Sequence, residues 1–445
     1  MTLTLENGSR VAVIGGGPAG SLFAYFLLTF VQRMDLEVGV DIYEPRDFTR
    51  AGPSGCNMCG GIVSETLVQA LAVEGIELPP TVVQRGIDSY VLHTRTGSVK
   101  IATPLRERRI AAVHRGGGPR DLEVLRWGGL DGYLLKLAQG QGAQVIATKI
   151  TDAGWDNDRP YVRVHGETRS YDLLVGATGV NSTGWQLFEK LGLRSTRVET
   201  TRAYVTELRL GLETITQHFG NSMHLFLLNL SRLDCAAIIP KGDYVTVCLL
   251  GRDVDDELIA RFFQEPAVRR CFPESWSPTQ GACHCAPRMN IREASQPFMD
   301  RVVLIGDCGV TRLYKDGIGA AFRTAKAAAR TAVFSGVSAD DFRRHYWPLY
   351  RSIARDNRYG FLLFAVMHRI KALEALLKGV LRTTAAEQTG GNGARRMSLV
   401  LLDMFTGSAP YRDIFFRTLA PGFVAEFLTG IVQAAVGGPR EGMVN

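Results

Sequence analysis

The stretch from Arg10 to Glu44 constrains the fold more than any other part of the chain. It reads RVAVIGGGPAGSLFAYFLLTFVQRMDLEVGVDIYE. An apolar run typical of a β-strand, Val11 to Ile14, leads into glycines spaced G-x-G-x-x-G, and an apolar helical segment follows from Ser21 to Val31. A second expected strand, Val38 to Tyr43, ends in Glu44. This order of elements predicts a βαβ unit that binds a dinucleotide: a strand, a glycine turn, a helix, a second strand and an acid.

Each glycine of the turn has its own physical role. Gly15 permits the tight turn, Gly17 leaves room for a pyrophosphate beside the backbone, and Gly20 lets the helix pack closely on the strand. The free N–H groups at the start of the helix attract the anion. Glu44 stands where an acid accepts hydrogen bonds from an adenosine ribose.

Size and charge narrow the class of protein. The chain has 445 residues with 46% hydrophobic and 21% charged residues, which is enough for two or three folded domains. The net charge is +7, and residues 346–445 hold 12 Lys and Arg against 7 Asp and Glu. This excess is either a solvated basic face or a surface for an anionic partner, such as a lipid head group or a diphosphate substrate. No nucleic-acid-binding motif is present, so we expect no nucleic-acid partner.

The lack of a recognisable targeting signal and the scattered cysteines indicate a cytoplasmic protein. The N-terminus MTLTLENGSR lacks the layout of a signal peptide, and no run of about 20 apolar residues predicts a spanning helix. The eight cysteines are scattered through the chain, which favours reduced thiols over a disulfide framework.

A C-x-x-C pair, Cys56 and Cys59, runs directly into Gly60 and Gly61. By itself this pair is a redox dithiol, half of a metal site, or two ordinary loop thiols. A metal site needs further ligands, and the only other cluster is the run from Cys283 to Cys285, so we expect no metal. The glycines favour close approach of the backbone to a planar ligand.

The middle of the chain predicts further strands. Ser89 to Thr103 is β-rich, and Gln144 to Ile150 and Leu173 to Val175 are short strand-like runs. Apolar and polar residues alternate strongly from Thr201 to Leu250. This pattern predicts an antiparallel sheet, which we expect to form a wall of a substrate cavity. A helical pattern begins near Arg126, which either pairs with a pyrophosphate or is a surface charge.

A second glycine turn follows the strand Val302 to Ile305, which ends in Gly306 and Asp307. Downstream, Gly317, Ile318 and Gly319 open an alanine-rich helix whose N–H groups can stabilise negative charge on a bound ring. The remainder, 340–445, is mainly helical in pattern and includes Arg358 to Arg382 and a glycine linker at 390–393. We interpret it as a helical cap, with interfacial membrane contact as the alternative.

Together these blocks resemble the geranylgeranyl reductase family, a branch of the FAD-dependent flavoproteins with the p-hydroxybenzoate hydroxylase fold. The resemblance covers about residues 10–330. It rests on RVAVIGGGPAG, on CNMCGGIV, on DLLVGATGVNS, on IIPKGDYVTVCL and on LIGDCGVTRLYKDGIGAA. CNMCGGIV is similar to the family's C-x-x-C-G-G block and is the most specific of the five. Two blocks depart from the family pattern. Thr178 stands where an aspartate is usual, and residues 235–239 lack the aromatic residues expected before Pro240.

The resemblance implies FAD and assigns roles to particular residues. Cys59, with Cys56, is the candidate catalytic thiol beside the flavin. Asp307 is implied to meet the ribityl chain, and Arg126 to neutralise the phosphates. The full set of implied cofactor contacts is Gly15, Gly17, Pro18, Ala19, Gly20, Glu44, Arg46, Gly60, Gly61, Arg126, Ile150, Asp307, Gly317, Ile318 and Gly319.

The implied activity is hydride transfer from reduced FAD to a C=C bond of a long apolar, isoprenoid-like substrate, with a nearby acid supplying the proton. No second nucleotide fold is evident, so the electrons come from transiently bound NAD(P)H or a ferredoxin-type carrier. The alternatives are a flavin monooxygenase of the same fold and a membrane-associated flavoprotein that relays electrons through contact at 346–445.

The expected fold class is α/β. A discontinuous Rossmann-like FAD domain takes residues 1–88, 120–185 and 295–340. An antiparallel-sheet substrate domain takes 89–119 and 186–294, and a helical region takes 341–445.

Overall fold

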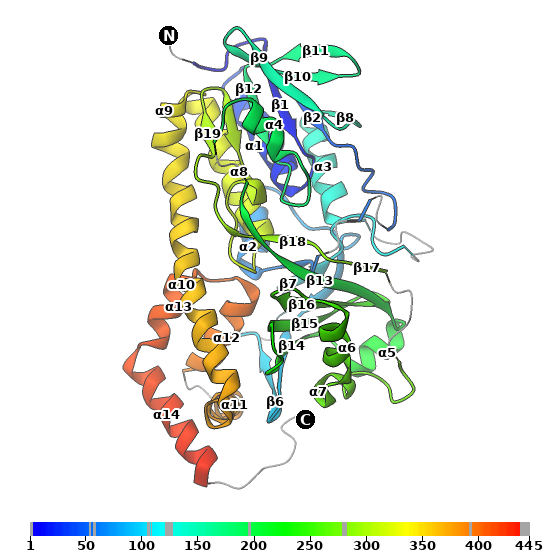
Figure 1. Cartoon of the computed structure of the whole chain (residues 1–445), viewed down its shortest axis with the longest axis vertical. Coiled ribbons are helices and arrows are strands. Elements are labelled where there is room, and N and C mark those ends of the chain that lie inside the picture. Colours follow the sequence, from blue (N-terminus) through cyan, green and yellow to red (C-terminus); the bar gives the residue numbers. More distant parts are fainter. Residues whose placement is uncertain are drawn as a thin grey trace. The chain divides into compact units, whose positions relative to one another are not determined.

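The computed structural model describes residues 3–52, 55–56, 59–104, 107, 109–120, 128–194, 197–277, 283–390 and 394–436. The chain forms two compact units, each built from three segments (Figure 1). The first unit takes Met1–Asn57, Arg115–Thr201 and Arg288–Arg355, and the second takes Met58–His114, Arg202–Pro287 and Asp356–Asn445. These boundaries differ from the expected ones. Residues 58–88 lie in the second unit, and so do the C-terminal helices from Asp356 onward.

The first unit is organised around a six-stranded sheet with the order β19-β20-β12-β1-β2-β8. The neighbours from β20 to β8 pair in parallel, and only the edge strand β19 is antiparallel. Numbered along the chain, the parallel strands run 3-2-1-4-5, the order of a doubly wound nucleotide-binding sheet. The strands are β1 (Ser9–Ile14), β2 (Val38–Tyr43), β8 (Gln144–Ile146), β12 (Leu173–Gly176), β19 (Phe298–Met299) and β20 (Val302–Leu304).

The expected strands of this sheet are present, and two of them end early: β20 stops at Leu304, one residue before the predicted end. The strand predicted from Gln144 to Ile150 ends at Ile146, because the N–H of Thr148 turns back to the carbonyl of Ile146 at 2.7 Å. Beyond it, Ile150 is buried in the apolar core with Val162 and Tyr171.

Helices cover the sheet of the first unit (Figure 1). α1 (Pro18–Arg33) packs on α3 (Leu130–Gly140) and on α8 (Gly317–Phe334). Pro18 at the first turn has a preset φ that suits a helix start, and Phe26 meets Phe322 edge to face at 5.4 Å. Val11, Ala12 and Val13 of β1 are fully buried, as expected for a parallel sheet covered on both faces.

Smaller elements complete the first unit. β9 (Asp152–Asp156), β10 (Arg159–Val164) and β11 (Glu167–Ser170) form an antiparallel meander. The others are α4 (Trp185–Lys190), β18 (Arg288–Arg292), the 3-10 turn η1 (Gly306–Cys308), α9 (Ala339–Asp341), the π-helical turn η2 (Phe342–Tyr346) and the start of α10 (Trp347–Ala372).

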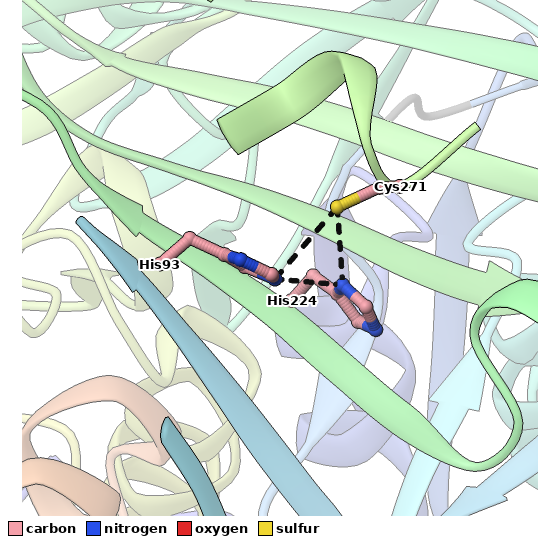
Figure 2. Close-up of side chains that lie close together, drawn as sticks. All are labelled: His93, His224 and Cys271. Carbon is pink, nitrogen blue, oxygen red and sulfur yellow. Dashed lines mark hydrogen bonds between the residues drawn. The ribbon is translucent and has the colours of Figure 1, made fainter. Parts of the chain in front are cut away.

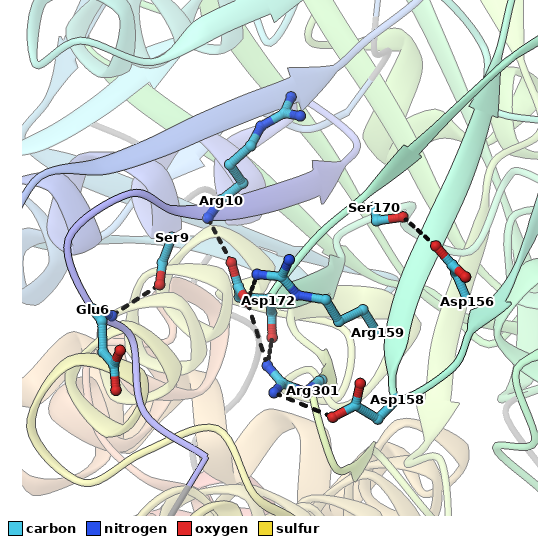
Figure 3. A network of polar contacts seen from close by, with 9 residues as sticks. All are labelled: Glu6, Ser9, Arg10, Asp156, Asp158, Arg159, Ser170, Asp172 and Arg301. Carbon is cyan, nitrogen blue, oxygen red and sulfur yellow. Dashed lines mark hydrogen bonds and ion pairs between the residues drawn. The ribbon is translucent and has the colours of Figure 1, made fainter.

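A polar network around Asp172 ties the strands of the first unit together (Figure 3). The N–H of Arg10 donates to Oδ2 of Asp172 at 2.9 Å, and Nε of Arg159 donates to Oδ1 at 3.0 Å. Nη1 of Arg301 donates to the carbonyl oxygen of Asp172 at 3.1 Å. Asp172 therefore joins β1 and β10 through its carboxylate and the entry to β20 through its backbone carbonyl, which holds the sheet that carries the glycine turn.

The large sheet of the second unit follows the path β17-β13-β16-β15-β14-β5-β6. All pairings on this path are antiparallel except β14 with β5. The strands are β5 (Ser89–Thr94), β6 (Gly97–Ala102), β13 (Glu199–Arg209), β14 (Ser222–Leu227), β15 (Leu233–Lys241), β16 (Tyr244–Gly251) and β17 (Cys283–Cys285). A small sheet of β3 (Ile62–Val63), β7 (Ile110–Val113) and β4 (Val83–Ile87) accompanies it, with helices α2 (Glu65–Val73), α5 (Leu212–His218), α6 (Asp256–Gln264) and α7 (Pro266–Arg269).

Alternation in Thr201–Leu250 predicts the antiparallel sheet, and the structure confirms it. Alternation is also typical of a sheet with one face in solvent, yet β14, β15 and β16 are buried along their whole length. α6 covers one face, with Phe226 edge to face on Phe262 at 5.5 Å.

The C-terminal helices are α10, α11 (Glu374–Thr389), α12 (Arg396–Thr406), α13 (Tyr411–Thr418) and α14 (Pro421–Val436). The helix predicted from Arg358 to Arg382 is interrupted at Leu373, whose extended backbone separates α10 from α11. The break follows Lys371, which is buried and donates to the carbonyls of Leu233 and Asp234 on β15. Of the glycine linker, 391–393 lies outside the described residues.

Glycine permits close packing of α11 on α14. A Cβ at Gly379 would lie 2.5 Å from Cγ1 of Ile431, and a Cβ at Gly430 would lie 2.2 Å from Oγ1 of Thr383. Among the described helices, no single one is long and apolar enough to cross a membrane. By length and composition only, α13 and α14 pass that test as a pair, with a bend of 63° between them.

Candidate active site

The glycine turn after β1 has the steric layout that a pyrophosphate needs. A Cβ on Gly15, whose φ is +109°, would lie 2.4 Å from the carbonyl oxygen of Ala177. A Cβ on Gly20 would lie 1.9 Å from the carbonyl oxygen of Gly15. At Gly17, by contrast, no described atom lies within 4 Å of such a Cβ. The outer glycines are required by packing, and the middle one borders open space at the N-terminus of α1.

Glu44 closes the other side of this turn. Its Oε2 accepts the N–H of Gly16 at 2.9 Å and its Oε1 accepts the N–H of Arg46 at 2.9 Å. The carboxylate is buried, and Nε of Arg46 lies 3.6 Å from Oε1. Each carboxylate oxygen has a second lone pair, so the geometry leaves Glu44 able to accept a ribose hydroxyl.

The second glycine turn lies against the first within the same unit. A Cβ on Gly306 would lie 2.7 Å from Cβ of Ala19, so the two turns touch. Asp307 follows in η1 and is half-buried. Burial raises the pKa of its carboxyl, and the hydroxyl of Thr311 and the charge of Arg115 partly offset this.

The same region holds the start of α8. A Cβ on Gly317 would lie 3.8 Å from Oδ1 of Asp307. Of the sequence-predicted cofactor residues, the structure therefore brings together those of the two glycine turns and of the α8 start. That set is Gly15, Gly17, Pro18, Ala19, Gly20, Glu44, Asp307, Gly317, Ile318 and Gly319.

Arg115 is a cation that the sequence reading missed. Its Nε donates to Oδ1 of Asp131 at 2.5 Å and its Nη2 donates to Oδ2 at 3.2 Å, while Asp131 is fully buried at the first turn of α3. The charge of Arg115 also reaches Asp307. Arg126, the cation predicted for the phosphates, lies outside the described residues. The run Arg115-Gly116-Gly117-Gly118 is the sequence signal that marks Arg115.

Asp316 sits at the start of α8 in a left-handed conformation, with φ of 57°. Its carboxylate lies over the backbone of Gly319, where a Cβ would be 2.1 Å from Oδ1. Arg323 and Arg312 lie 3.7 and 3.9 Å from its Oδ2. Burial raises the pKa of Asp316 to about 6 despite both arginines. A carboxylate therefore stands at the helix end where negative charge from a bound ring is expected.

The raised pKa of Asp316 predicts a pH dependence of stability. The folded state holds the proton more tightly than the unfolded chain, so this group makes folding less favourable as pH rises from about 4 to about 6. We expect Asp316→Asn to stabilise the protein by about 2 kcal/mol at pH 7 and to have little effect at pH 4. Asparagine tolerates the left-handed backbone, so the variant should fold. Chemical denaturation at both pH values measures this, and equal effects at pH 4 and 7 would contradict it.

In the second unit, a buried polar cluster lies under the Cys59-Gly60-Gly61 loop. Nζ of Lys241 donates to the carbonyl oxygen of Cys59 at 3.3 Å and lies 3.7 Å from Oε1 of Glu207. Lys241 is 1% exposed. A Cβ on Gly61, whose φ is +63°, would lie 2.0 Å from the carbonyl oxygen of Val113, so no other residue fits there.

Two further groups complete this cluster around Glu207. Oγ1 of Thr246 donates to Oε2 at 2.8 Å, and Nδ1 of His114 lies 3.8 Å from Oε1. Burial, followed by the charge of Lys241, lowers the pKa of His114 well below its usual value, so the imidazole is neutral. The cluster thus combines a cation, a carboxylate and a neutral imidazole away from water, a setting that suits proton transfer.

Cysteines gather near the same loop. Burial raises the pKa of Cys285 to about 12, and the neighbouring Cys59, Cys283 and Glu207 act in the same direction. Sγ of Cys248 would lie 3.5 Å from a Cβ on Gly60. Neither Cys56 nor Cys59 forms a disulfide within the described part of the chain.

A cleft of about 590 Å³ opens between β13 and α6 of the second unit. Its apolar lining includes Tyr204, Leu208, Ile259 and Phe263, and His284 of β17 stacks on Tyr204 at 5.9 Å. It therefore borders the strand that carries Cys283 and Cys285.

No family model matches the sequence, and no curated protein matches it. Solved structures do match along nearly the whole chain. The halogenase PltM in complex with phloroglucinol and FAD is 12% identical, covers 96% of this chain and 92% of its own, and has a TM-score of 0.58. A flavoprotein/dehydrogenase from Cytophaga hutchinsonii is 15% identical, covers 96% and 98%, and has a TM-score of 0.56. The flavin-dependent brominase Bmp2 is 14% identical, covers 95% and 93%, and has a TM-score of 0.54.

The chain shares the fold of these flavoproteins. This confirms the expected α/β class, with its Rossmann-like sheet, antiparallel sheet and helical C-terminal region. None of these three structures points to the geranylgeranyl reductase family in particular.

Proposed function

We propose that this chain is an FAD-dependent oxidoreductase that reduces C=C bonds of a long apolar, isoprenoid-like substrate. One observation carries the cofactor assignment: the open space at Gly17 between two glycines that tolerate no side chain. Gly15, Gly20 and the free N–H groups of α1 would hold the pyrophosphate, Glu44 the ribose and Asp307 the ribityl chain. When bound, FAD supplies a hydride acceptor and donor at its ring.

The chain's own contribution to the reduction is the proton. Saturating a C=C bond adds a hydride to one carbon and a proton to the other, and NAD(P)H or a ferredoxin-type carrier supplies the electrons. The buried cluster of Lys241, Glu207 and His114 is the proton store, with the carbonyl of Cys59 fixing Lys241 under the loop. The thiol of Cys59 is the alternative donor on the same loop. C-x-x-C-G-G, which this loop resembles, favours a reductase.

The test uses the full chain loaded with FAD and reduced by dithionite without oxygen. Addition of geranylgeranyl diphosphate should restore the absorbance of oxidised flavin and give a product heavier by two hydrogen atoms per reduced bond. Cys59→Ser separates the two proton donors, because full turnover in that variant excludes the thiol. An unchanged substrate and a flavin that stays reduced would contradict the proposed reaction.

Oxygen-dependent chemistry is the second candidate. It is favoured by the likeness of nearly the whole chain to the halogenase PltM and the brominase Bmp2. A reductase and an oxygen-using enzyme differ in the response of the reduced protein to air. If oxygen reoxidises it rapidly and a phenolic substrate gains oxygen or halide while geranylgeranyl diphosphate is untouched, the second candidate replaces the first.

Helix α14 supports contact with a membrane surface. Its exposed face carries Val424, Leu428, Val432 and Val436, and Glu426 is the only charged residue in the helix. Arg412 and Arg417 stand on the neighbouring α13. An apolar face beside basic side chains suits the interface of an anionic bilayer.

For membrane contact, we expect Leu428→Asp to lower binding to vesicles containing phosphatidylserine about tenfold. The substitution removes a buried apolar contact with the acyl region and adds a charge that anionic lipids repel. Sedimentation with vesicles measures binding, and Val73→Asp is the matched control, because Val73 is an exposed valine at the end of α2. Equal sedimentation of wild type and Leu428→Asp would remove the membrane assignment.

A further inference from the structure

A second cluster of reactive side chains lies in the large sheet of the second unit, outside the residues used above. His93 on β5, His224 on β14 and Cys271 after α7 point toward one another (Figure 2). Their exposed fractions are 7%, 6% and 5%. His93 and His224 are 131 residues apart, and His224 and Cys271 are 47 residues apart. The cluster therefore cannot be recognised from a short sequence motif.

The distances within the cluster are close to those of a metal site. Sγ of Cys271 lies 3.5 Å from Nδ1 of His224 and 3.7 Å from Nε2 of His93. A tetrahedral Zn²⁺ with typical bond lengths separates its sulfur and nitrogen ligands by about 3.6 Å. The two nitrogens lie 2.9 Å apart, so they would have to separate by about 0.5 Å to reach the tetrahedral spacing.

The surroundings hold the ligands in position. Nδ1 of His93, the nitrogen that faces away from the cluster, lies 2.8 Å from Oγ of Ser98. Such an outer hydrogen bond orients a metal-bound imidazole and fixes its tautomer. His93 stacks on Phe226 at 4.7 Å, and Phe219 packs edge to face on His224 at 5.0 Å. These rings leave the imidazoles little freedom to turn away.

Two of the three side chains already have the protonation state that binds a metal. Burial, with a contribution from Arg270, lowers the pKa of His93 to about 4. Burial, followed by His93 and Lys100, lowers the pKa of His224 well below its usual value. Both imidazoles are therefore neutral at pH 7, the form that binds metal. Burial raises the pKa of Cys271 to about 12, so the thiol keeps its proton until a metal displaces it.

We propose that His93, His224 and Cys271 bind one d¹⁰ metal ion, Zn²⁺ or Cu⁺. Two imidazoles and one thiolate are the ligand types that these ions prefer. Binding forms two metal–nitrogen bonds and one metal–sulfur bond, and it releases the thiol proton to solvent without any redox change. The bound ion would cross-link the segment after α7 to the two parallel strands β5 and β14.

The competing explanation is a hydrogen-bonded polar core without metal. One imidazole N–H can donate to the other ring, and the Cys271 thiol can donate to the carbonyl oxygen of Ala267 at 3.4 Å. Both explanations are compatible with these contacts, but only the metal site predicts stoichiometric binding that depends on all three side chains.

The experiment titrates the full untagged chain, after dialysis against a chelator, with Zn²⁺ and separately with Cu⁺ against a chromophoric competitor. We expect one equivalent of one of these ions, a rise in melting temperature and release of a proton on binding. Cys271→Ser should weaken binding at least about 100-fold and Ser98→Ala about tenfold. Cys235→Ser, at another buried cysteine of the same sheet, should bind as wild type.

A second readout covers the case in which Cys271→Ser does not fold. Wild-type protein loaded with Co²⁺ should show thiolate-to-metal charge-transfer absorption, and X-ray absorption of the bound metal should show one sulfur and two nitrogen ligands. Failure of the wild type to bind either ion overturns the proposal. Unchanged binding by Cys271→Ser, or a sulfur-only ligand set, also overturns it and assigns the metal to other cysteines.

Discussion

A Gly17→Asp variant should fold as well as the wild type and bind FAD at least about 100-fold more weakly. Gly17 is the N-cap of α1, with φ of −68°, and open space faces its missing side chain. Aspartate is a favoured N-cap residue, so the helix itself gains from the substitution. Its carboxylate, however, would lie where the pyrophosphate belongs, and juxtaposed like charges cost several kcal/mol. Circular dichroism and flavin fluorescence titration measure the two properties separately.

Two controls separate charge from bulk and from position. Gly17→Ser places a neutral cap in the same space and should weaken binding less than about tenfold, since no repulsion is added. Gly140→Asp introduces the same charge at another open glycine of the first unit, at the end of α3, and should bind FAD normally. Wild-type affinity in Gly17→Asp would mean that no anion occupies the first turn.

Lys241→Met should destabilise the protein by about 3 kcal/mol and remove most of the proposed reductase activity. Lys241 is 1% exposed, and its ammonium lies between Glu207 and the carbonyl of Cys59. Methionine fills similar volume, so the loss comes from the charge. Removing one partner of a buried pair leaves the other charge uncompensated, which typically costs 3–5 kcal/mol. Urea denaturation measures the free energy of unfolding, and anaerobic turnover measures activity.

The double variant Lys241→Met with Glu207→Gln tests whether the uncompensated Glu207 carboxylate causes the loss of stability in Lys241→Met. If the uncompensated carboxylate dominates, the second substitution should recover at least about 1 kcal/mol of the stability lost in the first. The proposed activity should not recover, because Lys241, a member of the proposed proton-donating cluster, is absent from both variants. Simple addition of the two single effects would show that Lys241 and Glu207 are not coupled.

The fold was largely predictable because its strongest signals are local. The strand from Val38 to Tyr43 and the glycine turn before α1 follow from residues adjacent in sequence. Ser64 caps α2 through an equally local contact, with its hydroxyl oxygen accepting the N–H of Leu67 at 3.3 Å. The break at Leu373 was not predictable, because it accompanies the burial of Lys371 against β15, a contact 138 residues away.

The residues of the candidate site likewise fall into those that local sequence predicts and those that only the tertiary fold brings together. Gly15, Gly17 and Gly20 are found from spacing alone, since their roles are set by one tight turn. The cluster of Lys241, Glu207 and His114 cannot be found from sequence spacing, because separate strands and loops bring these side chains together. The His93–His224–Cys271 cluster is hidden for the same reason. Placement of Ile150 in the apolar core also depends on β10, which its local sequence does not specify.

The flavin content of the purified full-length protein tests the central claim most directly. After gel filtration with excess FAD, absorbance of the folded protein should show one oxidised flavin per chain, and heat should release FAD that matches the standard by mass. A correctly folded preparation that remains colourless and takes up no FAD would contradict the account.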